Sequence, residues 1–125
     1  MTLGLFLVVA AGGIVGAPAR YLLDEFVTRR AGPGLPWGTL IINLSGSLLL
    51  GFLTGLTLAG HLRPAAQALL GTGFCGAYTT YSTFTFETVR LLGDGRFRSA
   101  AGNVLVSVAA GLGAAAAGLA AGLAL

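Results

Sequence analysis

The chain has 125 residues, of which 55% are hydrophobic and 9% are charged, and its mean hydropathy is +0.88. Soluble domains carry about a quarter charged residues, so this composition excludes a water-soluble globular protein and indicates an integral membrane protein. One cysteine and one histidine exclude an intrachain disulfide and a His/Cys metal cluster, and the +3 charge forms no basic stripe, so we expect neither an enzyme nor a nucleic-acid-binding protein.

Four uncharged runs follow one another along the chain, separated by short polar segments. Each is long enough to cross the hydrocarbon core of a bilayer, which takes about 20 apolar residues. We therefore expect an all-α fold with one transmembrane domain over residues 1–125 and spans at about 3–23, 37–60, 65–91 and 99–124. Arg20 then lies near the end of the first span, where it is expected to snorkel or to pair inside the protein.

The arginines are distributed unevenly between the predicted loops. Arg29, Arg30, Arg96 and Arg98 lie in the first and third loops, whereas the second loop holds only Arg63. Cytoplasmic loops carry an excess of basic residues. The sequence therefore predicts that loops one and three are cytoplasmic and that both termini are external.

Polar side chains occur inside the second and fourth spans, where an unsatisfied polar group costs several kcal/mol. Asn43 shares a helix face with Thr39 and Ser47 at four residues' distance on either side, and Asn103 and Ser107 repeat this spacing on the fourth span. Hydrogen bonds between helices are one explanation for this pattern. The lining of an ion path is the other, and it is the stronger one for Asn43.

The third span is unlike the others, because glycines are followed by a run rich in threonine that is poor material for a continuous helix. We expect a break in mid-membrane at Gly76 to Thr79, where freed carbonyl oxygens could hold a cation. Tyr81 and Phe84, three residues apart, are a candidate pore lining. Hydroxyl and amide donors without a mid-membrane acid favour an anion path but do not identify the anion, since Glu87 lies at the end of its span.

Small residues four apart recur in the spans and permit close approach of helix backbones. Either a subunit interface or packing within one subunit would account for these pairs, and both explanations stay open. The pairs are Gly12 and Gly16, Ser47 and Gly51, Gly51 and Gly55, Ser107 and Gly111, and Gly118 and Gly122. Because four helices barely enclose a pore, we expect a dimer.

Three segments together resemble the Fluc (CrcB) family of fluoride channels. They are GGIVGAPARY at 12–21, GTLIINLSG at 38–46, and GFCG at 73–76 followed by TTYSTF at 79–84 and Glu87. Their order, spacing and total length match over essentially the whole chain. The resemblance implies passive export of cytoplasmic fluoride across the cell inner membrane, which lowers fluoride toxicity, through an antiparallel dimer with two pores.

The resemblance also implies particular roles for residues of this chain. It implies a structural sodium ion held by main-chain carbonyls of Gly76 and Thr79, with no organic cofactor, and it places Arg20 at the vestibule. Glu87 and Asn103 receive no defined role. The residues that it assigns to the ion pore are Asn43, Tyr81, Phe84, Ser82, Thr83 and Ser107. Thr39 joins these pore candidates as the neighbour of Asn43 on its helix face.

Tyr81 departs from the family pattern, which typically has phenylalanine there. A phenol keeps the ring edges and adds a hydroxyl that needs a partner. Together with the uneven arginines, this departure raises the hypothesis that the partner is a paralogous subunit of opposite topology rather than a second copy in an antiparallel homodimer. Two other classes fit less well: a small multidrug exporter would need an acid in the first span, and a scaffold subunit leaves Asn43 unexplained.

Overall fold

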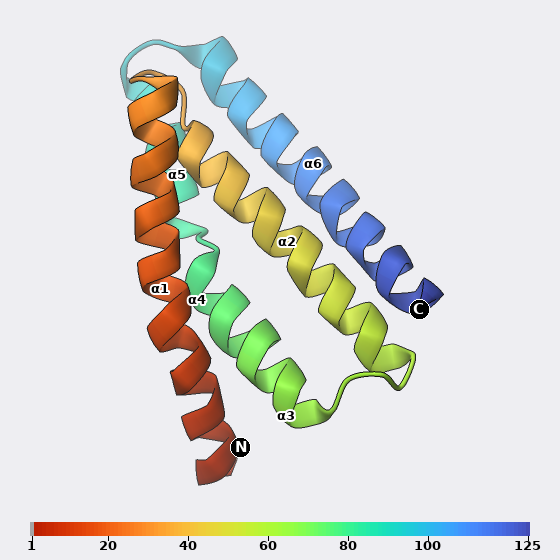
Figure 1. Ribbon diagram of the computed structural model, residues 1–125. Helices are drawn as coiled ribbons and strands as arrows, with labels where there is room; N and C mark the ends of the chain where they lie inside the picture. The colour runs from red at the N-terminus through yellow and green to blue at the C-terminus, as the bar shows by residue number, and fades with distance from the viewer. Residues whose placement is uncertain (1) are drawn as a thin grey trace.

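The computed structural model describes residues 2–125, and all regular secondary structure in this part of the chain is helical, as the sequence predicted (Figure 1). The helices are α1 (Leu3–Ala31), α2 (Trp37–Leu58), α3 (Pro64–Gln67), the π-helix η1 (Ala68–Cys75), α4 (Gly76–Tyr78), α5 (Ser82–Gly93) and α6 (Phe97–Ala124). Among the described residues, three helices are long and apolar enough to cross a membrane, namely α1, α2 and α6. The third predicted span corresponds to the succession from α3 to α5.

Local chemistry explains where the long helices begin and end. The Thr2 hydroxyl accepts a hydrogen bond from the Leu5 amide at 3.1 Å and caps the start of α1. Arg29 and Arg30 occupy the last turn of α1, where their positive charges interact favourably with the negative end of the helix dipole. Gly32 ends the helix as its C-cap and has φ +79°, a backbone conformation that favours glycine.

The helices run alternately up and down, and both ends of the chain point toward the same end of the molecule (Figure 1). α6 packs along α2, and the two run in the same direction. α1 packs against η1 and α4, whereas α5 packs against the first half of α6. The loops between α1 and α2 and between α5 and α6 therefore lie at one end, and the loop before α3 lies at the other.

The glycine pairs are explained by packing within the chain. A Cβ atom at Gly55 would lie 2.5 Å from the Leu119 carbonyl oxygen, and one at Gly73 would lie 2.5 Å from that of Val9. The backbones at these crossings approach too closely for any side chain. The same is true of Gly12 and Gly16 against η1, and of Gly51, Gly118 and Gly122 at the α2–α6 contact. Gly111, in contrast, has open space beside it.

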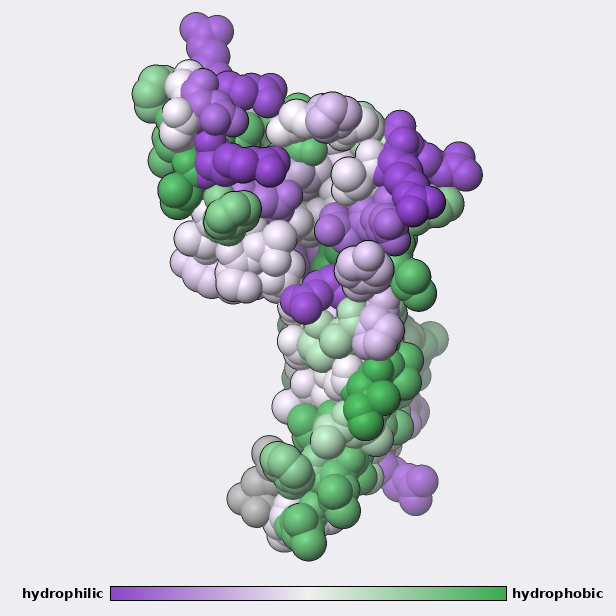
Figure 2. All heavy atoms as spheres, turned by 90° about the vertical axis from the view of Figure 1, so that its left-hand side faces the viewer, coloured by the Kyte–Doolittle hydropathy of each residue, from purple (hydrophilic) through white to green (hydrophobic). Residues whose placement is uncertain are grey.

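Most of the large apolar side chains face outward. Leu3, Ile14 and Leu105 are about 70% exposed, whereas the small core includes Ile42 and Cys75. The face in Figure 2 is apolar over its lower part and polar at the end where α1 finishes and α6 begins. A surface of this kind requires lipid or protein to cover it, which the bilayer provides for a multi-pass membrane protein.

Candidate functional site: the segment between α4 and α5 and its asparagine clamp

The helical path is interrupted between α4 and α5. Thr79 has an extended backbone, with φ −81° and ψ 161°, and α5 begins only at Ser82. Gly76, where the sequence placed the start of an interruption, is itself helical with φ −62° and ψ −36°. The non-helical residues are therefore 79–81, a few residues further along than the sequence indicated.

Asn43 on α2 holds this segment through both ends of its side-chain amide. Its Nδ2 donates to the Thr80 carbonyl oxygen at 2.8 Å, and its Oδ1 accepts from the Thr80 amide at 2.8 Å. These bonds satisfy a backbone donor and a backbone acceptor that the interruption leaves without helical partners. Asn43 thus binds the backbone directly, and one Nδ2 hydrogen remains for another acceptor.

Thr80 has a second role that the sequence reasoning missed. Its hydroxyl accepts a hydrogen bond from the Thr83 amide at 3.2 Å and donates to the Thr83 hydroxyl at 3.1 Å. An amide three residues ahead that donates to a threonine hydroxyl is the bonding pattern of a helix cap, so Thr80, one residue before the N-cap position Tyr81, caps the first turn of α5. The signal available in the sequence was the position of Thr80, three residues before Thr83 in the first turn of α5.

A cavity of about 260 Å³ opens beside the clamp. Of the predicted pore residues, Asn43 and Tyr81 line it, and so does Thr79 of the predicted sodium site. The other predicted pore residues do not line it, namely Thr39, Ser82, Thr83, Phe84 and Ser107. Tyr81 is exposed and its ring stacks on that of Phe84, with 6.1 Å between the centroids. Ser82 is also exposed on the first turn of α5. The cavity lining comprises Asn43, Gly46, Ser47, Leu50, Thr79, Thr80 and Tyr81.

Two further polar pairs tie α2 to the segments on either side of the interruption. The hydroxyl of Thr39, which is buried, donates to Glu87 Oε1 on α5 at 2.5 Å. Ser45 donates to the Ile42 carbonyl oxygen at 3.1 Å and, since its one proton is used there, accepts from the Tyr78 hydroxyl at 2.8 Å. Sequence reasoning missed the pair of Ser45 and Tyr78.

The polar residues of α6 face α5 instead of the cavity. Asn103 Nδ2 donates to the Thr88 hydroxyl at 2.9 Å, and Ser107 lies 3.5 Å from Asn103 Oδ1. Thr88 in turn donates to the Phe84 carbonyl oxygen at 2.8 Å, so a chain of polar groups leads from α6 to Phe84. Arg20 is half-buried on α1, and no hydrogen bond joins it to the cluster among residues 2–125.

Main-chain oxygens at the interruption are available as ligands. Within residues 2–125 no hydrogen bond reaches the carbonyl oxygens of Gly76 and Thr79, because the amides of Thr80 and Thr83 are bonded elsewhere. Carbonyl oxygens are the ligands that hard cations prefer. The donor set therefore fits the sodium ion expected at these two residues.

The fold and this site define the class of protein. It is a multi-pass helical membrane protein in which a short non-helical segment is held by an asparagine clamp and flanked by hydroxyl and aromatic groups. Irregular backbone of this kind is tolerated inside a membrane only where it is buried in protein or lines a cavity.

Comparison with known proteins identifies the family. The family model described as CrcB-like protein, Camphor Resistance (CrcB), matches residues 7–119, and the chain belongs to this family. A protein of Streptomyces avermitilis named Fluoride-specific ion channel FluC 1 is 54% identical over 114 residues, which cover 91% of this chain and 92% of that protein.

Two further relatives are also named fluoride-specific ion channels. The FluC 1 of Frankia casuarinae is 50% identical over 121 residues, which cover 92% of this chain and 93% of the relative. The FluC of Nitrobacter winogradskyi is 46% identical over 114 residues, which cover 90% of each chain. The similarity therefore extends over nearly the whole of each protein.

Proposed function

We propose that this chain is a subunit of a fluoride-selective ion channel through which cytoplasmic fluoride leaves the cell passively. The observation that carries the proposal is its 54% identity, over 92% of the relative's length, to a protein named a fluoride-specific ion channel. Passive export lowers the concentration of fluoride inside the cell and so its toxicity. We place the channel in the cell inner membrane, with residues 79–81 at the depth of the hydrocarbon core.

The chemistry around the clamp supports an anion path. Hydroxyl groups of Tyr81, Ser82 and Thr83 and the free Nδ2 hydrogen of Asn43 are hydrogen-bond donors. The ring edges of Tyr81 and Phe84 carry the positive end of the aromatic quadrupole. A small anion such as fluoride would exchange part of its hydration shell for these groups, while Thr39, Ser107 and the half-buried Arg20 act further along the path.

The path requires a second subunit. Tyr81 and Ser82 are exposed, and open space lies beside Gly76 and Gly111, so one chain leaves the lining incomplete. We propose an antiparallel dimer, formed either with a second copy or with a paralogous subunit of opposite topology. The names FluC 1 and FluC 2 among the relatives favour the existence of such paralogues.

A sodium ion bound by the carbonyl oxygens of Gly76 and Thr79 would stabilise this dimer. Their lack of hydrogen-bond donors among residues 2–125 supports the site, and the ion would supply a fixed positive charge to these carbonyl dipoles. Replacing sodium by N-methylglucamine in the detergent buffer should then lower the unfolding temperature of the purified protein. An unchanged unfolding temperature would argue against the ion.

Fluoride flux is the direct test of the function. The chain is purified, reconstituted into liposomes loaded with fluoride or chloride, and monitored by ion-selective electrodes. Rapid fluoride efflux with little chloride efflux is the expected result. Equal efflux of both ions would contradict the proposed selectivity. Absence of efflux of either ion, both from the chain alone and from the chain reconstituted with a paralogue of opposite topology, would contradict the proposed channel.

A further inference from the structure

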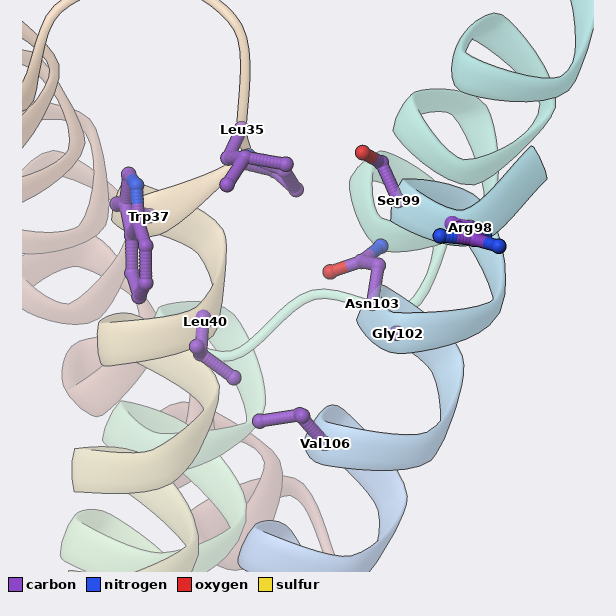
Figure 3. Close-up of a pocket in the computed structure, with 9 residues that line it drawn as sticks. Leu35, Trp37, Leu40, Arg98, Ser99, Gly102, Asn103 and Val106 are labelled. Carbon is purple, nitrogen blue, oxygen red and sulfur yellow. The ribbon is translucent and has the colours of Figure 1, made fainter. Parts of the chain in front are cut away.

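A groove separates the first turns of α2 and α6, at the end of the molecule opposite the chain termini (Figure 3). It has a volume of about 340 Å³. The glycine contacts that bring α2 and α6 together lie in the second halves of the two helices, at Gly51, Gly55, Gly118 and Gly122. The first half of α6 packs on α5 instead, so the start of α2 is left without a neighbour on this side.

The walls of the groove are apolar and its rim is cationic. Leu35, Trp37 and Leu40 form one wall, and Val106 lies opposite on α6, where Ser99 and Asn103 add two polar groups nearer the start of the helix (Figure 3). Arg98, on the first turn of α6, borders the groove and is exposed. The one ion pair among residues 2–125 joins Arg29 to Glu25, so Arg98 has no carboxylate partner there.

The surroundings add positive charge at the same end. Arg96 approaches the loop before α2, where its Nη1 lies 3.6 Å from the position of a Cβ at Gly34. Arg29 and Arg30 end α1 nearby. Basic residues at the cytoplasmic surface attract anionic lipids with about 1 kcal/mol each, and basic pockets between transmembrane helices bind lipid headgroups.

We propose that this groove binds one anionic phospholipid, with an acyl chain against Leu40 and Val106 and the phosphate on the Arg98 guanidinium. Apolar walls favour an acyl chain and disfavour a hydrated anion, while the unpaired guanidinium provides charge complementarity for a phosphate. Trp37 begins the apolar helix α2, and interfacial aromatic residues are enriched at such ends of membrane spans. The groove shares no lining residue with the cavity beside the clamp, and lipid binding there does not require conduction.

Native mass spectrometry of the purified full-length chain tests the proposal, with phosphatidylglycerol and phosphatidylcholine as probes. Phosphatidylglycerol should be retained more strongly than phosphatidylcholine. Arg98→Gln should weaken its retention about fivefold, the factor that corresponds to the contribution of one basic residue at a membrane surface. Arg98→Lys should keep most of the binding. Arg63→Gln, at the opposite end of the molecule, is the matched control and should change nothing.

A second variant tests the apolar part of the site with Arg98 intact. No atom lies within 4 Å of a Cβ at Gly102, which lines the groove, so Gly102→Leu should fill it without displacing the backbone. We expect Gly102→Leu to abolish retention and Gly113→Leu, outside the groove on the same helix, to leave it intact.

Three results would overturn the proposal. Equal retention of the two lipids would show that the groove does not select an anionic headgroup. Unchanged phosphatidylglycerol binding in Arg98→Gln and Gly102→Leu, with fluoride efflux reduced, would make the groove a mouth of the ion path. Unchanged lipid binding with loss of the dimer in Gly102→Leu would make the occupant a second copy of the chain.

Discussion

Asn43 connects two parts of the chain that are 37 residues apart in sequence. Its side chain pairs a donor with the Thr80 carbonyl and an acceptor with the Thr80 amide, and no other side chain of the same length offers both groups. Aspartate lacks the donor, and glutamine is longer by one methylene. The first task of Asn43 is therefore to fix the backbone of residues 79–81, and its contact with a passing anion depends on that.

Asn43→Asp should reduce fluoride efflux from liposomes at least about tenfold. The carboxylate would face the Thr80 carbonyl oxygen without a donor and would add a negative charge to an anion path, and a barrier of about 1.4 kcal/mol already corresponds to a factor of ten. Gln67→Glu makes the same chemical change beside Thr54, away from the clamp, and should leave most of the flux. Unchanged flux in Asn43→Asp would remove Asn43 from the path.

Thr80→Val should lower the free energy of unfolding by about 1 kcal/mol, the usual cost of a lost helix cap. Valine keeps the shape of threonine but leaves the Thr83 amide without its acceptor. Thr80→Ser retains the hydroxyl and should stay close to the unsubstituted protein. An SDS titration followed by circular dichroism measures both variants, and an equal loss in the two would show that the methyl group, not the cap, stabilises α5.

At the scale of helices, hydropathy and loop chemistry predicted the all-α fold, because apolar length alone decides whether a segment crosses a bilayer. Long-range pairing was not predictable in the same way. Asn43 was recognised as a costly polar group, yet its partner depends on how α2 packs against residues 79–81. The spacing of Gly118 and Gly122 predicted a close contact, but spacing carries no information on whether the facing helix belongs to the same chain.

Gly118→Leu should destabilise the protein by about 1–3 kcal/mol, the typical cost of overpacking. A Cβ there would collide with the backbone of α2 at Leu48, so the two helices must separate. Gly113→Leu, five residues earlier on α6, meets no atom within 4 Å and should be tolerated. The SDS titration again gives the comparison, and equal stability of the two variants would contradict a close α2–α6 contact.

At the scale of the whole molecule, one end is marked by charge. Arg29, Arg30, Arg96 and Arg98 lie at the end formed by the loops before α2 and α6, and Arg63 lies at the other. An antiparallel dimer of identical chains needs both orientations of one sequence, whereas this asymmetry favours one orientation. The orientation of the chain in the membrane therefore bears directly on the identity of its partner.

Cysteine labelling in intact cells measures that orientation. Cys75 is buried and is replaced by alanine, after which Pro33→Cys reports on the loop before α2 and His61→Cys on the loop before α3. The positive-inside rule predicts that a membrane-impermeant maleimide labels His61→Cys fully and reaches Pro33→Cys only after permeabilisation. Labelling of about half of each variant would instead show dual topology. In that case the arginine asymmetry is too weak to orient the chain, and a homodimer is sufficient to build the channel.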